Sequence, residues 1–373
     1  MNYLLAFVAT LILSIFFTGV VRNFALKYHL APKLRQRDSH QKPTPRIGGV
    51  AIFAAFFLVS IFYFLIIDRH AIIGGGQWFG LDKRIVGIWL GSLTVVLAML
   101  YDDIRGLSAW KKLGFQIVAA LIVIAGGIGV GTLTNPFGQA INLNSVIINI
   151  NIFGGVHHIW LWSDLLAFFW LVGMMNVINF IDGIDGLAAG ISGIAAFIIF
   201  LLSLAVSQSA VAMIAIILCG ATVGFLWWNF YPAKIFMGDS GSMFLGFLLG
   251  VLPLISGGKL ATAFLVLGFA IVDGLIVAAA RVIRGKNPFT TADRTHLHHR
   301  FLAAGFSVPA TVISLYIIAA LFGWVALRST TTNKIIASSV LIIFIGVLIL
   351  GLNQIKKNRK TQETNRKQIT NLK

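Results

Sequence analysis

The chain has 373 residues, of which 58% are hydrophobic and only 11% charged, and its formal net charge is +17. Its mean hydropathy of +0.91 lies far above that of soluble globular proteins, so we expect an integral membrane protein. A single cysteine, Cys219, excludes an intramolecular disulfide framework. These numbers exclude secreted disulfide-rich and intrinsically disordered proteins.

Apolar runs of the length that crosses ~30 Å of hydrocarbon, about 20 residues each, predict an all-α integral membrane protein with about eleven transmembrane helices. The runs cover residues 3–21, 47–67, 85–101, 113–131, 160–181, 184–206, 209–230, 241–256, 260–280, 307–327 and 335–353. The first run has no basic residue ahead of it and no cleavage site, which indicates a retained span and not a signal peptide. We expect residues 1–355 to form one multi-span domain and residues 356–373 to be a disordered basic cytoplasmic tail.

Lysine and arginine predict how the chain is oriented. Counted on alternate sides of the spans, 23 of the 29 Lys and Arg residues fall on one side, which the positive-inside rule assigns to the cytoplasm. The N-terminus is then outside and the C-terminus inside. The high isoelectric point follows from this topology, so we expect no nucleic-acid partner. On the outer side, apolar residues alternate with asparagines over residues 141–152, which predicts a small β-hairpin.

Carboxylates are scarce in this chain, because 11 aspartates and one glutamate are its only acids. Clusters of acids beside apolar spans are costly and mark function. Asp102 and Asp103 close the third span, with Lys112 ten residues on. Adjacent residues on a helix point about 100° apart, so we expect one carboxylate to face a metal or substrate and the other to hold a basic partner. A solvated charge pair at a helix end is the alternative.

A second polar segment closes the fifth span. Asn176, Asn179, Asp182 and Asp185 recur at every third position, so consecutive members lie on neighbouring turns and form one polar stripe. Glycines follow both aspartates, where the backbone can break or a ligand can approach. The stripe predicts a functional site, with packing as the alternative.

A third segment reads Gly-Asp-Ser-Gly-Ser over residues 238–242, ahead of an apolar run. It supplies backbone N–H groups and hydroxyls at a helix N-terminus, which suits a phosphate. The carboxylate of Asp239 would suit its Mg²⁺. The alternative is a capping role alone.

The longest cytoplasmic loop carries a fourth segment with His296, His298 and His299 between Arg294 and Arg300. Three histidines allow a zinc site, but no cysteine is nearby and the acids suit a hard, oxygen-ligated ion. Alternating histidine and arginine favours a diphosphate clamp. A plain basic loop stays open as well.

With these motifs in place, the chain resembles the polyprenyl-phosphate N-acetylhexosamine-1-phosphate transferases, integral membrane enzymes that move a sugar-1-phosphate from a UDP-sugar to a lipid phosphate. The similarity runs from Lys42-Pro-Thr-Pro-Arg46-Ile-Gly-Gly49 through the histidine loop, with all motifs in family order. It is closer to the branch that primes O-antigen, enterobacterial common antigen or wall teichoic acid. The peptidoglycan branch has three consecutive histidines, and here Leu297 interrupts them.

The resemblance implies a reaction and a role for each matching residue. GlcNAc-1-phosphate would pass from UDP-GlcNAc to undecaprenyl phosphate at the cytoplasmic face of the bacterial cytoplasmic membrane, releasing UMP, with Mg²⁺ as cofactor and Mn²⁺ as a substitute. The expected catalytic residues are Asp102, Asp103, Asp182 and His298, and the expected metal ligands are Asp239 and Asp182. The expected nucleotide-binding residues are Asn179, Asp185, Asn229 and Phe236. The diphosphate and sugar are expected at His296, His298, His299 and Arg300, and the lipid phosphate at Lys42, Arg46 and Lys112.

Two other classes of function stay open. A secondary transporter could use intramembrane Asp and Asn, but transporters tend to place such sites at the midplane of an internal repeat, whereas these acids lie at one interface and no repeat is visible. A non-catalytic scaffold is the other alternative. The expected partners are undecaprenyl phosphate, a UDP-N-acetylhexosamine and membrane lipids, with homodimerisation open. The sequence also leaves open the sugar, the glycan and whether transfer is direct or passes through an aspartyl-phosphate.

Overall fold

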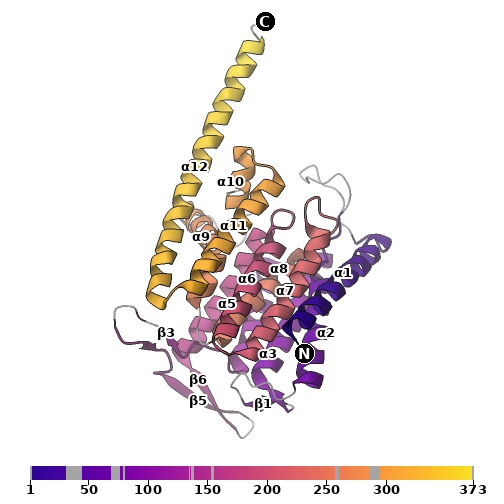
Figure 1. The fold of residues 1–373 in the computed structure, drawn as a ribbon, viewed down its shortest axis with the longest axis vertical. Coiled ribbons are helices and arrows are strands. Elements are labelled where there is room, and N and C mark those ends of the chain that lie inside the picture. The colour runs from indigo at the N-terminus through magenta and orange to yellow at the C-terminus, as the bar shows by residue number, and fades with distance from the viewer. Residues whose placement is uncertain are drawn as a thin grey trace.

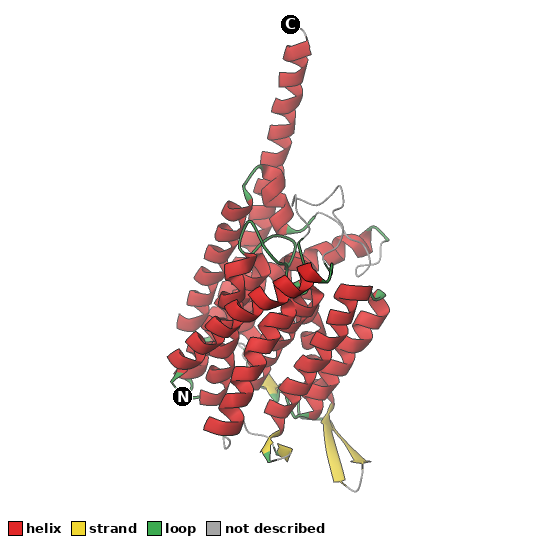
Figure 2. Cartoon of the chain, turned by 90° about the vertical axis from the view of Figure 1, so that its right-hand side faces the viewer, coloured by secondary structure: helices red, strands yellow, loops and turns green. Residues whose placement is uncertain are grey.

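A computed structural model describes residues 2–30, 44–68, 76–78, 80–133, 135, 138–152, 155–256, 260–285 and 295–371. The helices run side by side in one bundle, three short antiparallel hairpins lie at one end, and the chain termini lie at opposite ends (Figure 1). Helices make up most of the described residues, so the predicted all-α integral membrane fold is confirmed. Figure 2 shows the strands gathered below the bundle and the last helix projecting above it.

The helices and strands follow one another in this order. The helices of the first half are α1 (Tyr3–Lys27), α2 (Gly49–Phe62) with its π-helical extension η1 (Tyr63–Ile67), α3 (Lys83–Arg105), α4 (Ala109–Ala125) and α5 (Leu161–Ile181). Those of the second half are α6 (Leu187–Ala205), α7 (Ser209–Asn229), α8 (Gly238–Ile255), α9 (Leu260–Ile283), α10 (Leu297–Ala304), α11 (Val308–Arg328) and α12 (Thr331–Asn371). The strands are β1 (Gln77–Trp78), β2 (Leu81–Asp82), β3 (Thr132–Leu133), β4 (Ile141–Asn142), β5 (Ile147–Ile152) and β6 (Gly155–Trp160).

Within the described ranges, ten helices are long and apolar enough to cross a membrane. Hydrocarbon offers no hydrogen bonds, so each crossing segment satisfies its backbone groups as a helix. One predicted span, residues 113–131, is not among these ten helices. It corresponds to α4. This helix has only 17 residues, because it ends before Gly126 and Gly127. At ~1.5 Å per residue it is about 25 Å long.

Helix α8 lies at the centre of the bundle and packs against α2, α3 and α5. Its residues from Ser240 to Ile255 are all buried, as expected for a helix that is apolar all round. The first turn of α8 comes so close to the start of α2 that a Cβ atom on Gly49 would overlap the backbone of Gly241. This approach places the segment before α2 against the loop before α8.

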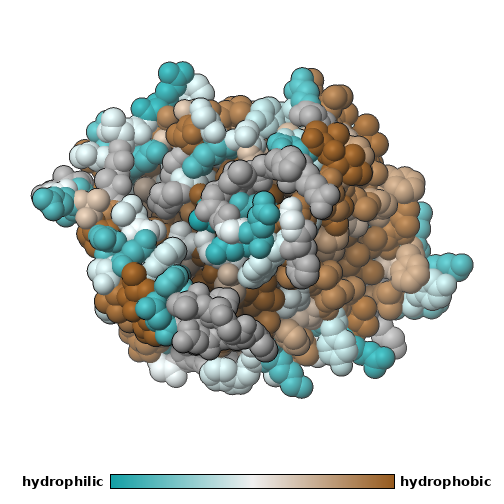
Figure 3. All heavy atoms as spheres, turned by 90° about the horizontal axis from the view of Figure 1, so that it is seen from below, coloured by the Kyte–Doolittle hydropathy of each residue, from teal (hydrophilic) through white to brown (hydrophobic). Residues whose placement is uncertain are grey.

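The predicted outer strands are present, but their pairing differs from a single hairpin at 141–152. Strand β4 pairs with β3, and β5 pairs with β6, which follows it in the chain. The alternation of apolar and polar residues predicts strands, whereas the partner of each strand depends on the turns between them. Seen from this end, hydrophobic side chains cover the right-hand flank, while hydrophilic ones gather toward the centre and left (Figure 3).

The basic tail also differs from the prediction. Helix α12 continues from its apolar half through residue 371, where the sequence predicted disorder beyond residue 355. Residues 354–373 contain neither glycine nor proline and are rich in Lys, Arg and Gln, which are good helix formers.

Candidate active site

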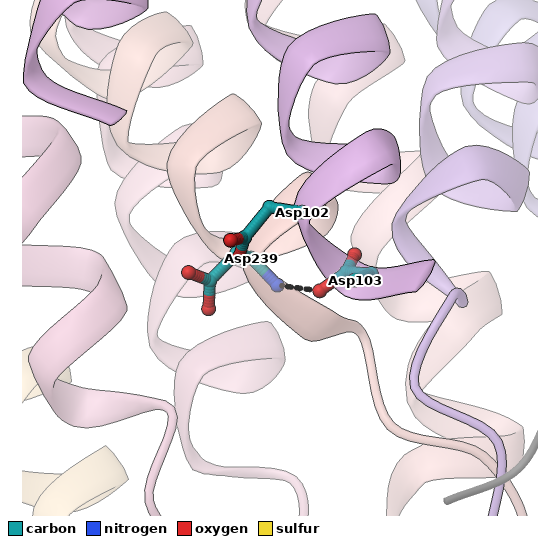
Figure 4. Close-up of side chains that lie close together, drawn as sticks. All are labelled: Asp102, Asp103 and Asp239. Atoms are coloured by element: carbon teal, nitrogen blue, oxygen red, sulfur yellow. Dashed lines mark hydrogen bonds between the residues drawn. The ribbon is translucent and has the colours of Figure 1, made fainter. Parts of the chain in front are cut away.

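Three carboxylates from two helices that are far apart in the sequence meet at one end of the bundle. Asp102 and Asp103 end α3, Asp239 begins α8, and one oxygen from each lies within 4.8 Å of the others. We refer to these three residues as the carboxylate cluster. Asp102 and Asp239 lie together on one side, and Asp103 lies on the other side of the Asp239 backbone (Figure 4).

Asp103 binds the N-terminus of α8. Its Oδ1 accepts a hydrogen bond from the backbone N–H of Asp239 at 2.8 Å, and its Oδ2 accepts one from that of Ser240 at 3.1 Å. These N–H groups have no partner within their own helix, and a carboxylate stabilises them as a capping residue would. Asp103 therefore fixes the position of Asp239 relative to α3.

Asp102 holds a basic partner, as the sequence predicted for one member of the pair. Its Oδ2 lies 2.6 Å from the Nζ atom of Lys112, in the first turn of α4, and the same Nζ lies 2.7 Å from Oδ2 of Asp239. The other oxygen of Asp102 accepts the backbone N–H of Leu107 at 2.6 Å. The ammonium group therefore joins α3 and α8 through their carboxylates.

The polar stripe of α5 supplies the next contacts. The Nδ2 of Asn179 donates to Oδ1 of Asp239 at 3.0 Å and to Oγ of Ser242 at 2.9 Å. One turn earlier, the Nδ2 of Asn176 donates to Oε1 of Gln116 on α4 at 3.0 Å. The stripe thus faces α4 and α8, and it connects the cluster with the bundle interior.

Asp182 follows directly after α5. Burial, and then the neighbouring carboxylates of Asp239, Asp103 and Asp185, hold its pKa well above the ordinary value of 3.8, while Arg46 acts in the opposite direction. Its side chain therefore shares the electrostatic environment of the cluster. Among the described residues, the group of three with metal-ligand spacing does not include Asp182.

The donor set fits a divalent metal ion. Three carboxylates each place one oxygen within 4.8 Å of the others, and carboxylate oxygens are the ligands that hard cations such as Mg²⁺ prefer. The Lys112 ammonium already lies between Asp102 and Asp239, so the arrangement is built around positive charge. The Asn179 amide holds the remaining Asp239 oxygen in place.

Two of the predicted nucleotide-binding residues hold the loop between α7 and α8. The buried carboxylate of Asp185 accepts the backbone N–H of Ala233 at 2.9 Å. The buried amide of Asn229 accepts the N–H of Gly186 at 3.1 Å and donates to the carbonyl of Ile235 at 2.9 Å. Both side chains therefore join this loop to the turn between α5 and α6.

Phe236, at the end of that loop, is held by the segment before α2. Its N–H donates to the carbonyl of Pro45 at 2.8 Å, and its carbonyl accepts the N–H of Gly48 at 2.9 Å. The guanidinium carbon of Arg46 lies 6.0 Å from the centre of the Phe236 ring. Arg46 and Phe236 are thus brought together, whereas Lys42 lies outside the described residues.

The short helix α10 carries the histidines and is anchored by a residue that sequence reasoning did not assign. The buried Asp273 of α9 accepts the N–H of Leu297 at 2.9 Å and bonds to Nδ1 of His296 at 2.8 Å. Asp273 lies within the apolar run of residues 260–280. The sequence feature that could have indicated its importance is its position, because a carboxylate inside an apolar span needs a partner.

His298 lies against the turn that follows α5. Its buried Nε2 has no hydrogen-bond partner among the described residues, and a Cβ atom on Gly183 would overlap the imidazole. Burial, followed by the charges of His299 and His296, holds the pKa of His298 well below its ordinary value. Burial therefore favours the neutral form of His298, and its Nε2 is the ring atom nearest to Gly183.

The other two residues of this motif lie differently. The ring of His299 lies 4.2 Å from that of His298, measured between ring centres. Arg300 donates from Nε to the carbonyl of Thr295 at 2.7 Å and from Nη1 to Asn353 of α12 at 3.0 Å. The structure therefore brings His298 and His299 together and directs Arg300 toward α12.

Residues 85–257 match the family described as Glycosyl transferase family 4. The chain is 30% identical over 356 residues, 93% of its length and 90% of the relative's, to the Bacillus subtilis (strain 168) protein named "Probable undecaprenyl-phosphate N-acetylglucosaminyl 1-phosphate transferase". It is 31% identical over 291 residues to the undecaprenyl-phosphate alpha-N-acetylglucosaminyl 1-phosphate transferase of Thermotoga maritima, covering 78% of this chain and 79% of that one. Against the decaprenyl-phosphate N-acetylglucosaminephosphotransferase of Mycolicibacterium smegmatis it is 30% identical over 332 residues, with 82% and 77% covered.

Proposed function

Since the chain belongs to the superfamily of polyprenyl-phosphate N-acetylhexosamine-1-phosphate transferases, we propose that it transfers GlcNAc-1-phosphate from UDP-GlcNAc to undecaprenyl phosphate and releases UMP. The product starts a lipid-linked cell-surface glycan. The site faces the cytoplasm, where UDP-sugars are made, and the chain is a multi-pass protein of the bacterial cytoplasmic membrane.

The observation that carries this proposal is that carboxylate, ammonium and amide groups meet at one end of the bundle, where carboxylates suit a metal ion and the ammonium suits a phosphate. Four helices, α3, α4, α5 and α8, contribute Asp102, Lys112, Asn179 and Asp239 to one hydrogen-bonded group. The polar groups lie at the ends of these helices, as suits a lipid phosphate that stays at the membrane surface. A transporter site would be expected near the midplane instead.

The attacking group is the phosphate of the lipid, whose second pKa is about 6, so it is largely a dianion at neutral pH. Its oxygen forms a bond to the β-phosphorus of the UDP-sugar, and the bond from that phosphorus to the bridging oxygen of UMP breaks. No proton has to be removed from a dianion. Catalysis therefore depends on alignment and on charge neutralisation.

The aspartates support direct transfer over a covalent aspartyl-phosphate. Both oxygens of Asp103 accept N–H groups of α8, and Asp102 is bonded to Lys112 and to the backbone of Leu107. Neither carboxylate is presented as an isolated nucleophile. We infer that Asp103 positions Asp239 and that Lys112, the basic partner of Asp102, binds the lipid phosphate.

Asp239 and Asp102 would hold a Mg²⁺ ion, which, when bound, supplies positive charge to the phosphate oxygens. Phe236 would stack on the uracil ring, while Asp185 and Asn229 keep its loop in place. His298 would donate to the diphosphate or the sugar from α10, which packs against the turn after Asp182. As Arg300 is bonded to Thr295 and Asn353, its role toward the diphosphate would require those bonds to exchange.

A reconstituted assay tests this function. The purified protein, undecaprenyl phosphate and Mg²⁺ are incubated with a panel of UDP-sugars, and lipid-linked product and released UMP are measured. We expect equal amounts of both with UDP-GlcNAc, and no product from Asp239→Asn, which keeps the size of the side chain. Product with another UDP-hexosamine alone would correct the sugar, whereas no product with any donor would refute the proposal.

A further inference from the structure

Lys112 occupies the position that a cation bound by the carboxylate cluster would need. Its ammonium lies 2.6 Å from Asp102 and 2.7 Å from Asp239. The second oxygen of Asp239 is already bonded to Asn179, and both oxygens of Asp103 are bonded to α8. A metal ion would therefore draw on the same Asp102 and Asp239 oxygens that now hold Lys112.

Two positive groups cannot share this position without strong repulsion, because the Coulomb energy grows as their separation falls. One must leave when the other binds. Lys112 can leave without moving the fold, since it lies in the first turn of α4, its side chain is 26% exposed, and its head stands on a flexible four-carbon stem. The neighbouring Lys111 is exposed and pairs with neither carboxylate.

We propose that Lys112 is an exchangeable counter-ion of the metal site. In the metal-free protein its ammonium holds Asp102 and Asp239 together against their mutual repulsion. Binding of a divalent cation displaces the ammonium, which then binds the phosphate of the lipid acceptor. This inference rests on the proposed function, and it adds that metal and lipid phosphate bind cooperatively through one side chain.

Metal binding without turnover tests the exchange. The full-length protein in detergent, with no substrate present, is titrated with Mn²⁺ and the free ion is followed by electron paramagnetic resonance. If Lys112 competes with the metal, Lys112→Gln binds Mn²⁺ up to about fivefold more tightly than the wild type, since that factor is the upper end for an exposed ion pair. Lys111→Gln, which removes the same charge from the same helix turn, changes the affinity little.

Lys112→Met is measured beside Lys112→Gln, because it keeps the apolar stem and removes both charge and hydrogen bonds. Both variants are expected to have a lower midpoint of thermal unfolding without metal, and Mn²⁺ should raise that midpoint more than in the wild type. An unchanged or weaker Mn²⁺ affinity in both variants would overturn the exchange. If Lys111→Gln gains as much Mn²⁺ affinity as Lys112→Gln, the gain is a general effect of net charge and the exchange is overturned.

The coupling to the acceptor is measured with farnesyl phosphate in the same detergent. In the wild type, this lipid phosphate should tighten Mn²⁺ binding, because it takes up the displaced ammonium. In Lys112→Gln the tightening should disappear. Equal tightening in both proteins would overturn the second half of the proposal. These outcomes do not depend on turnover. A protein that is inactive in the transfer assay could still show the exchange between Lys112 and the metal, and an active protein could lack this exchange.

Discussion

Asp102 and Asp103 are neighbours in the chain, yet their carboxylates have different partners. Asp103 binds backbone N–H groups of α8, and Asp102 binds Lys112. The helical geometry of about 100° per residue was enough to predict that their roles differ. It could not predict which aspartate takes which role, because that depends on how α3 packs against α8 and α4, far away in the sequence.

The uracil role of Phe236 leads to a prediction about substrate affinity. Stacking of an aromatic ring on a base is worth about 1–3 kcal/mol, so Phe236→Ala should raise the KM for the UDP-sugar roughly tenfold or more. The KM for the lipid phosphate serves as the internal control and should change little. Steady-state kinetics with each substrate varied in turn distinguishes the two. A change confined to the lipid KM would remove Phe236 from the nucleotide site.

At the scale of the elements, apolar runs locate the spans well, since hydropathy along the sequence reports burial in lipid directly. The contacts between elements are harder to predict from the sequence. The position of α10 depends on the buried Asp273, which lies 23 residues before His296 in the chain. The partner of Asp273 cannot be identified from the sequence, because an acid inside a span indicates only that some partner exists.

The close contact between α10 and the turn after α5 can be tested at Gly183. A Cβ atom there would overlap the imidazole of His298, so Gly183→Ala should displace His298 from the site. Displacements of about 1 Å can cost up to about a hundredfold in rate, and we expect kcat to fall about tenfold or more. Gly173→Ala is the matched control on α5, since no atom lies within 4 Å of its added Cβ. Equal activity of the two variants would show that the contact is dispensable.

The lowered pKa of His298 predicts a pH dependence of stability. The unfolded chain binds a proton on this imidazole near its ordinary pKa of 6.5, whereas the folded protein excludes it. The contribution of His298 to the free energy of unfolding should therefore be fully present above about pH 6.5 and should be lost as the pH falls below it. The neighbouring groups that contribute are His296 and His299, with Gly183 packed against the ring.

Thermal unfolding in detergent checks this at several pH values. The raised pKa of Asp182 acts in the opposite direction, so the difference between the proteins is the test. Between about pH 7 and about pH 5.5, the unfolding midpoint of the wild type should fall relative to that of His298→Gln. His299→Gln serves as the comparison, because that imidazole is only partly buried. If all three proteins show the same slope, the decrease arises elsewhere.

For the whole molecule, the distribution of lysine and arginine predicts a C-terminus inside and hairpins outside. The C-terminus and the hairpins do lie at opposite ends of the bundle (Figure 1), but their orientation in the membrane stays a prediction. The only native cysteine, Cys219, is buried in α7, so cysteine labelling can test it. In a Cys219→Ala background, Val146→Cys beside the hairpins should react with an impermeant maleimide in intact cells. Gln354→Cys on α12 should react only after the membrane is opened, and the reverse pattern would invert the topology.

In the proposed reaction, the sugar moves together with its phosphate. UDP-GlcNAc labelled with ³²P at the β-phosphorus distinguishes this from transfer of the sugar alone. We expect the label to enter the lipid fraction in the same amount as UMP is released, and Asp239→Asn to transfer none. If the label stays in the nucleotide fraction as UDP while the sugar reaches the lipid, the protein is a simple glycosyltransferase and the proposed role of the carboxylate cluster is wrong.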